Sequence, residues 1–186
     1  HYQKVQLADI AKLEPYYMTE YALVAFASQK NDLSKQIAEY GLKANPRHAG
    51  YNRLALYNAV ELKQYDEAIN YVDRLLNQSD SVEVTANDYK FAALAYTGAK
   101  NYDEAINYYS KQLEATETPE AKADVLKALS DSYKAKGDLV NSLAKYKEYL
   151  TVNPNANAND YAGFATIYRN MAAELTGEEQ KASVNE

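Results

Sequence analysis

Two pairs of neighbouring acidic residues have side chains of a type that could support catalysis. Asp66 and Glu67 recur as Asp103 and Glu104, and paired carboxylates can share general acid and general base work. Both pairs, however, open segments in which apolar residues have helical spacing. Negative side chains in the first turn of a helix stabilise the helix dipole, so we interpret both pairs as structural rather than catalytic.

Other catalytic and metal-binding groups are sparse. The chain has no cysteine, and its two histidines are His1 and His48. His48 falls in the segment ANPRHAG, which predicts an exposed loop rather than a metal site. The six glycines form no phosphate-binding loop, and neither a nucleophile elbow nor a zinc-protease motif occurs. The sequence therefore predicts a protein that is not an enzyme and uses no cofactor or metal.

The overall charge disfavours polyanionic partners. The 186 residues carry a net charge of -6 and no basic run, whereas nucleic acids and anionic membranes favour clustered Lys and Arg. No apolar stretch approaches the roughly 18 to 20 residues of a spanning helix, and none at the start resembles a signal peptide. We therefore expect no nucleic-acid partner and no membrane insertion. Because the chain opens with His1 and Tyr2, we also expect it to be part of a longer protein.

One heptapeptide occurs twice, and it sets the period of the chain. YDEAINY stands at residues 65–71 and again at 102–108, 37 positions later. NDYKFAALAY at 87–96 similarly returns as NDYAGFATIY at 159–168, and two units of about 36 residues fit between them. Each match has apolar residues at helical spacing, and turn residues such as Gly137 separate the helices. This rhythm of helix, turn and helix predicts a stacked helical solenoid.

The pattern within each unit resembles the tetratricopeptide repeat family, in which large aromatic and small residues recur at fixed places in two helices. The clearest unit has Tyr89, Ala92, Ala93, Tyr96, Ala105 and Tyr109 at these places. The next has Leu126, Leu129, Ser130, Tyr133, Ser142, Tyr146 and Pro154. An earlier unit has Tyr51, Leu54, Ala55, Asn58, Ala68 and Val72, with one extra residue in its turn. A weaker unit begins with Tyr21, Val24, Ala25 and Ser28.

The resemblance implies an all-α fold, a right-handed superhelical solenoid of helix-turn-helix repeats. We expect a single array over residues 1–186. It would comprise a half unit at 2–15, units at about 17–47, 48–84, 85–120 and 121–156, and a half unit at 158–186. The Asn-Asp pairs before Tyr89 and Tyr161 are expected to cap helices.

The last predicted helix, 160–175, has an apolar face that we expect to pack inward on the preceding unit. Its members are Tyr161, Phe164, Ile167 and Tyr168. The residues after this helix are expected to begin a partner helix. An apolar face of that size predicts further tetratricopeptide-like units beyond Glu186.

In the family, five places on each first helix line an inner groove. The resemblance assigns candidate groove residues to three helices: Asn87 and Lys90, then Asp124, Lys127, Asp131 and Lys134, then Arg169 and Asn170. The four central residues share one helix face. Two interpretations stay open: the charges pair along a solvated helix, or they bind polar groups of a specific extended peptide. The family's clamp for chaperone tails is missing, because Leu94 and Asp131 stand at its asparagine places.

The function predicted from these features is a non-enzymatic scaffold that binds a peptide or a partner helix of another protein through the groove. Two alternatives stay open. The 19 tyrosines would suit a module that binds glycan or another ligand in a bacterial cell-envelope protein. The chain could also be the helical regulatory region of a larger enzyme. Localisation follows only by analogy, to the bacterial periplasm or cell envelope, with the cytoplasm as the alternative.

Overall fold

The computed structural model describes residues 15–184, so the half unit predicted at 2–15 lies outside the described residues except for Pro15. The chain forms two compact units, one ending at Asn101 and the other beginning at Tyr102. The described part of each unit consists of helices and the turns that connect them, apart from one isolated β-bridge between His48 and Asp80 in the first unit. No helix between residues 15 and 184 is long and apolar enough to cross a membrane. The all-α class predicted from the sequence is confirmed.

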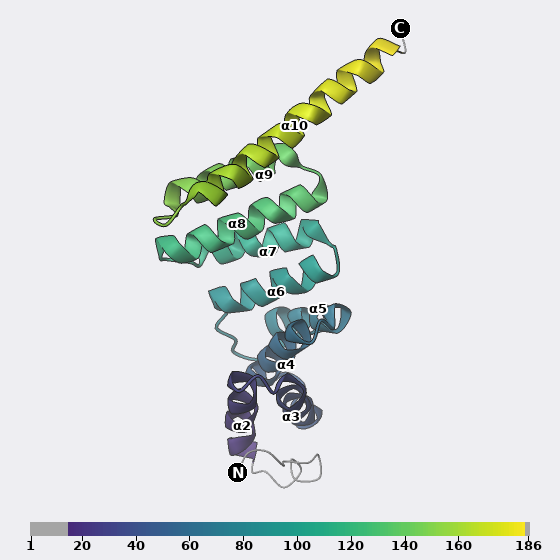
Figure 1. Ribbon diagram of the computed structural model, residues 1–186. Coiled ribbons are helices and arrows are strands. Elements are labelled where there is room, and N and C mark those ends of the chain that lie inside the picture. Colours follow the sequence, from purple (N-terminus) through teal and green to yellow (C-terminus); the bar gives the residue numbers. More distant parts are fainter. Residues whose placement is uncertain (1–14, 185–186) are drawn as a thin grey trace. The chain divides into compact units, whose positions relative to one another are not determined.

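The first unit is a succession of packed helices. In its described residues it contains α2 (Pro15–Ala27), α3 (Asn31–Ala44), α4 (Ala49–Glu61), α5 (Tyr65–Asp73), a π-helical turn η2 (Arg74–Gln78) and α6 (Ala86–Gly98). Consecutive helices contact each other, and α4 also contacts α2 and α6 (Figure 1). The helices that open successive hairpins therefore lie side by side.

The second unit contains α7 (Tyr102–Glu114), α8 (Pro119–Lys136), α9 (Leu139–Val152) and α10 (Ala158–Val184). Each helix packs on the next, and Leu126, Tyr146, Tyr149 and Ile167 form the core between α8, α9 and α10.

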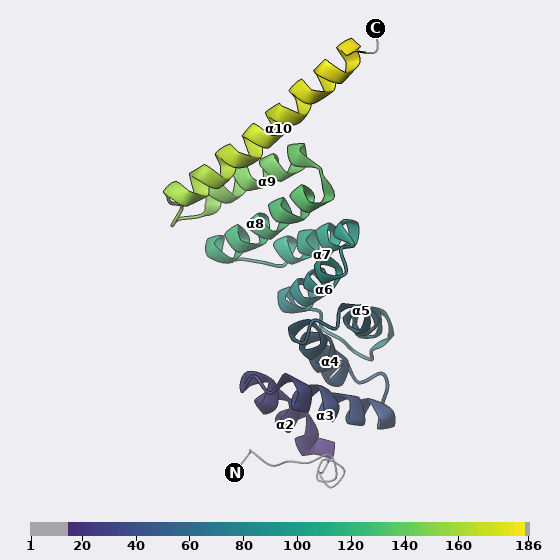
Figure 2. The same cartoon turned by 45° about the vertical axis from the view of Figure 1, so that its right-hand side comes forward.

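The last helix, α10, is longer than predicted. The expectation that it ends near residue 175 is wrong, because it continues without a turn to Val184 (Figure 2). The predicted partner helix is therefore absent from residues 176–184. Gly177 does not end the helix, since one glycine costs only about 1 kcal/mol there and good helix formers follow it at residues 178–182.

The same turn ends α2, α4, α6 and α8. Its central residue has a positive φ of 57° to 89°, and the four residues are Gln29, Lys63, Lys100 and Gly137. In each turn the next amide donates to the carbonyl five residues earlier, as Gln64 does to Ala59 at 2.8 Å. This Schellman motif satisfies carbonyl groups that the end of a helix leaves unpaired.

These turns predict opposite effects of substitution at two places. Lys63→Gly is expected to raise the free energy of unfolding by about 0.5 to 1 kcal/mol, because a left-handed conformation strains any residue with a Cβ atom. Gly137→Ala is expected to lower it by about 1 kcal/mol for the same reason. Urea denaturation of the two variants measures both effects. Shifts of the same sign would contradict this account of the turns.

The turn residue also corrects the predicted register of two units. The residues seven positions before it are all fully buried: Ala22, Leu56, Ala93 and Ser130. The sequence pattern placed Ala25 in α2 and Ala55 in α4 at this small-residue position. Both assignments are wrong: the position belongs to Ala22, three residues earlier, and to Leu56, one residue later. Consistent with the shift, Val24 is exposed, and the turn after α4 has no extra residue because it matches the other three.

Buried serines form hydrogen bonds between the two helices of a hairpin, close to this small-residue position. Ser34 Oγ on α3 donates to the Ala22 carbonyl on α2 at 2.7 Å. Ser130 Oγ on α8 likewise donates to the Ser142 carbonyl on α9 at 2.7 Å. Small side chains let two helices approach closely, and each hydroxyl satisfies a polar group inside the contact. Ala105 on α7, which the sequence places in the same class, is also fully buried.

Candidate functional site

All eight residues predicted for the groove are exposed. In the first unit, α6 carries Asn87 and Lys90. In the second unit, α8 carries Asp124, Lys127, Asp131 and Lys134, and α10 carries Arg169 and Asn170. The structure thus places them on three helices, α6, α8 and α10. It also gives one of them, Lys127, a partner on another helix.

Lys127 links three helices of the second unit. Its Nζ lies 3.4 Å from Asp160 Oδ1 on α10 and 5.1 Å from the centre of the Tyr149 ring on α9. Burial opposes the charge of Lys127, but the oxygens of Tyr149, Tyr146 and Asp160 outweigh it and raise the pKa of Lys127. Lys127 therefore has a structural role that the sequence did not predict.

Asp160 is the acceptor at this junction. It is buried, and it accepts hydrogen bonds from the Tyr149 hydroxyl at 2.6 Å and from the Asn157 amide at 3.0 Å. These hydrogen bonds, that from Tyr149 first, hold the pKa of Asp160 below its usual value. Burial and the hydrogen bond to Asp160 raise the pKa of Tyr149. Asp160 is therefore charged and Tyr149 is protonated at neutral pH.

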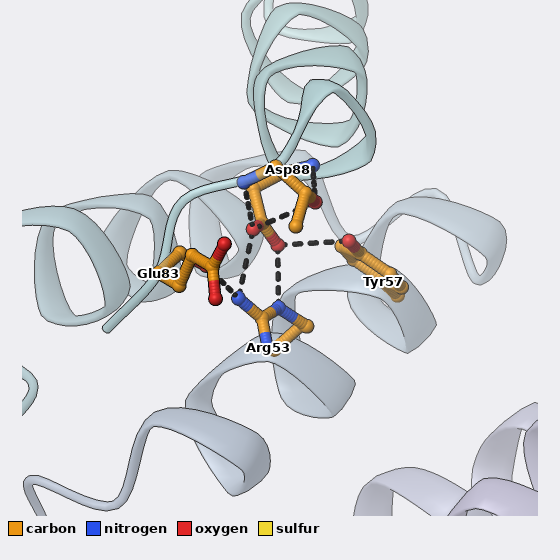
Figure 3. Close-up of polar contacts among 5 residues, drawn as sticks. Arg53, Tyr57, Glu83 and Asp88 are labelled. Atoms are coloured by element: carbon orange, nitrogen blue, oxygen red, sulfur yellow. Dashed lines mark hydrogen bonds and ion pairs between the residues drawn. The ribbon is translucent and has the colours of Figure 1, made fainter. Parts of the chain in front are cut away.

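The first unit has a similar junction with arginine in place of lysine (Figure 3). Asp88, near the start of α6, is 0% exposed. Arg53 on α4 donates to both carboxylate oxygens, from Nε at 2.7 Å and from Nη2 at 2.9 Å. The Tyr57 hydroxyl donates to Asp88 at 2.8 Å, and Arg53 Nη2 also donates to the Glu83 carbonyl at 2.8 Å. A two-pronged pair of this kind fixes orientation as well as distance.

The charges in this junction are fixed at neutral pH. Burial acts to raise the pKa of Asp88, but hydrogen bonds from Arg53, the Thr85 amide and Tyr57 outweigh it and lower that pKa. Burial, followed by the hydrogen bond to Asp88, raises the pKa of Tyr57. The hydrogen bond to Asp88 is also the main reason why the pKa of Arg53 is raised. The junction of Arg53, Tyr57 and Asp88 therefore holds α4 and α6 together, and the directions of its pKa shifts do not suit proton transfer at neutral pH.

Both aspartates also correct the predicted helix caps. The cap of α6 is Thr85, whose hydroxyl accepts from the Asp88 amide while Asp88 Oδ2 accepts from the Thr85 amide at 2.8 Å. Asp160 accepts from the Asn157 amide in the same way. In both helices the aspartate lies in the first turn rather than before it, as the acidic residue does in the capping box of α6. The repeated Asn-Asp-Tyr sequence marks both places, but it does not reveal that the aspartate faces the preceding hairpin.

Three aromatic rings meet across the first helices of the first unit, and we call them the aromatic cluster. Phe26 on α2, Tyr57 on α4 and Phe91 on α6 are half-buried. Tyr57 and Phe91 stack with ring centres 3.9 Å apart, and Phe26 lies 5.9 Å from Tyr57 and 6.4 Å from Phe91. A hollow beside Phe26 is lined by Gln29, Asn31 and Glu61. The sequence did not indicate this cluster, because it combines residues from three helices.

The remaining candidates for chemistry have structural partners. His48 is wrongly predicted as an exposed loop residue: its Nδ1 accepts from the Tyr51 amide at 3.2 Å and caps α4. The predicted carboxylate pairs do open α5 and α7, and Glu67 accepts a 2.6 Å hydrogen bond from Lys35. In the part of the chain that the structure describes, no group of three His, Cys, Asp or Glu residues could hold a metal ion.

Comparison with known proteins identifies the kind of repeat. A model of the tetratricopeptide repeat family matches residues 89–123, and no curated protein matches the chain. The solved structure of YrrB, described as a TPR protein with an unusual peptide-binding site, is 12% identical with a TM-score of 0.71. The match covers 86% of this chain and 78% of YrrB.

Two structures of MamA are also similar. A crystal structure of MamA is 16% identical with a TM-score of 0.68, and the match covers 87% of this chain and 96% of MamA. MamA from Desulfovibrio magneticus RS-1 is 16% identical with a TM-score of 0.65, and 75% of each chain is covered. At these identities the likeness establishes the fold alone. The chain contains a tetratricopeptide repeat at residues 89–123 and has the all-α, helix-turn-helix solenoid fold of the tetratricopeptide repeat family.

Proposed function

We propose that this protein is a non-enzymatic scaffold that binds an extended peptide of another protein across the first helices of its hairpins. The tetratricopeptide repeat fold supports a role in protein interaction, and the similar structure YrrB is described as having a peptide-binding site. The observation that carries the proposal is the aromatic cluster. Its three half-buried rings, from α2, α4 and α6, form an aromatic surface that is still partly open to solvent. Aromatic anchors of this kind dominate the binding energy of many interfaces.

The surroundings of the aromatic cluster indicate what kind of peptide would fit. Lys90 is exposed on α6, one residue before Phe91, and Glu61 lines the hollow beside Phe26. Gln29 and Asn31, in the same hollow, have side-chain amides that can donate to and accept from a peptide backbone. A peptide with an apolar or aromatic side chain on the rings, and with charges of both signs beside it, would satisfy these groups.

We propose that each unit offers a partner its own polar contacts, which lie on the predicted groove residues of that unit. They are Asn87 and Lys90 on α6, Asp124, Asp131 and Lys134 on α8, and Arg169 and Asn170 on α10. Lys127 is already paired with Asp160, so its removal would change stability as well as binding. Lys90 and Lys134 are therefore the better positions at which to test charge recognition.

The experiment is selection of a phage-displayed random peptide library on the immobilised chain, followed by calorimetry with synthetic copies of the selected peptides. Phe26→Ala and Phe91→Ala are each expected to weaken binding at least about tenfold, because each removes an aromatic anchor. Lys90→Ala is expected to weaken it less, since the lysine is exposed to solvent. Val140→Ala is the matched control, because it removes a 68% exposed apolar side chain from α9.

Circular dichroism of every variant must show unchanged helix content for the comparison to count. The proposal fails if the library yields no binder. It also fails if the selected peptides bind the Phe26→Ala and Phe91→Ala variants as tightly as the original chain.

A further inference from the structure

The final helix, α10, has two distinct faces. One face packs on α9: Asp160 and Ile167 are buried, and Phe164 lies 6.3 Å from the Tyr146 ring. The adjacent face carries a stripe of exposed residues, Tyr161, Ala165, Tyr168 and Ala172. Both tyrosines are 57% exposed, which corrects the prediction that they pack inward. We call these four residues the Tyr-Ala stripe.

The corresponding face of α8 is covered. Leu126 and Ser130 stand on α8 where Tyr161 and Ala165 stand on α10, and both are buried. The helix that covers them is α9, as the hydrogen bond from Ser130 to Ser142 shows. The Tyr-Ala stripe is therefore a surface of the kind that this fold normally pairs with a second helix.

The described residues that follow, as far as Val184, do not supply that second helix. In α2, α4, α6 and α8 the left-handed turn comes seven residues after the small residue, which on α10 would be at Ala172. Instead α10 remains helical through Ala172 and on to Val184. Figures 1 and 2 show its C-terminal part extending beyond α9. The Tyr-Ala stripe stays open along a straight helix.

The order of residues in the Tyr-Ala stripe makes the stripe complementary to a second, identical stripe that runs in the opposite direction. Large and small residues alternate at spacings of four, three and four, the heptad-like period at which two helices keep one seam in contact. When two such helices run antiparallel, Tyr161 of each lies opposite Ala172 of the other, and Tyr168 lies opposite Ala165. Each large ring then packs against a small residue, and the phenol hydroxyls can remain at the solvent-exposed edge of the contact.

We propose that this face is a self-association surface: the Tyr-Ala stripe of α10 pairs antiparallel with the same stripe of a second copy of this chain. The contact is isologous, because the same four residues serve on both copies. It has no charged member, so it needs no buried ion pair. The seam is about 16 Å long, which suits a dimer that forms and separates with concentration. This surface lies on a different helix from the aromatic cluster, so either proposal can fail without the other.

Sedimentation velocity over a concentration series tests the association. The full chain is expected to shift from monomer to dimer as its concentration rises. Tyr161→Ala and Tyr168→Ala are each expected to lower the association constant at least about tenfold. Val140→Ala, which shortens an exposed apolar side chain on α9, should leave it unchanged. Because both tyrosines are exposed, their replacement should preserve helix content, and circular dichroism checks this.

Disulfide trapping tests the direction of pairing, since the chain has no cysteine of its own. In the antiparallel arrangement the two Ala165 residues lie near the centre, whereas the two Ala172 residues lie about 16 Å apart along the axis. A disulfide requires Cα atoms within about 7 Å. Under mild oxidation, Ala165→Cys should therefore give a covalent dimer and Ala172→Cys should not. Adding Tyr161→Ala to the Ala165→Cys chain should slow the trapping.

Two results would overturn the proposal. One is a chain that stays monomeric at every concentration, which would leave the stripe to a different protein or to a further segment of a longer chain. The other is equal trapping of Ala165→Cys and Ala172→Cys, which would show a parallel contact or random collision.

Discussion

Replacing Asp88 with alanine is expected to lower the free energy of unfolding by about 3 kcal/mol. The carboxylate is 0% exposed and accepts from both Arg53 and Tyr57. Its removal leaves the guanidinium and the phenol without their acceptor inside the contact between α4 and α6. The Thr85 amide also loses its hydrogen bond at the start of α6. Urea denaturation followed by circular dichroism measures the change.

The control is Asp80→Ala, which removes a different aspartate–arginine pair. Asp80 and Arg47 are 2.7 Å apart, but both side chains are more than 60% exposed. A solvent-exposed pair contributes about 0 to 1 kcal/mol. Equal losses in the two variants would show that burial of the Asp88 junction does not matter.

The free energy of unfolding lost in Asp88→Ala should also depend on pH, and it should shrink as the pH falls. The pKa of Asp88 is lower in the folded chain than its ordinary value, which is about 3.9 in an unfolded chain. The contribution of Asp88 is therefore fully present above that value and disappears as the pH falls through the lower, folded pKa. The difference between the original chain and Asp88→Ala should be constant from about pH 5 to pH 7 and shrink below about pH 4.

Leu56→Ala is expected to cost about 3 kcal/mol of unfolding free energy. Leu56 is 0% exposed and stands in α4 at the place where other units have alanine or serine. The smaller side chain leaves a cavity, because the surrounding helices relax only in part. Leu23→Ala is the matched control, since Leu23 on α2 is 50% exposed. A change below about 1 kcal/mol at Leu56 would show that Leu56 does not hold the closely packed place that the turn assigns to it.

The repeat period was enough to predict helical hairpins, but it could not fix the register of every helix. In α2 the family's large aromatic place holds Met18, and the turn residue is Gln29 rather than glycine. Tyr21 lies three residues further on and offered a false starting point. The helix also carries Leu23 and Val24 on its exposed side, so the apolar pattern alone does not distinguish the buried face.

The candidate site was harder to predict, because its contacts join residues that are far apart in the sequence. Arg53 and Asp88 are separated by 35 residues, and Lys127 and Asp160 by 33. Once the turns set the register, Arg53, Lys90 and Lys127 stand at one place, ten residues before the turn residue. That regularity could have suggested a shared role. The contact among the rings of Phe26, Tyr57 and Phe91 depends on side-chain directions that no spacing encodes.

The Arg53–Asp88 junction has a consequence for how the first unit opens and closes. In a chain of stacked repeats, one hairpin can unfold alone unless an interface energy ties it to its neighbour. The buried ion pair between α4 and α6 supplies such a tie, and it is accompanied by the stacked rings of Tyr57 and Phe91. Hydrogen–deuterium exchange of the backbone amides of α4 and α6 should therefore report one shared free energy of opening, as expected for members of one cooperative unit.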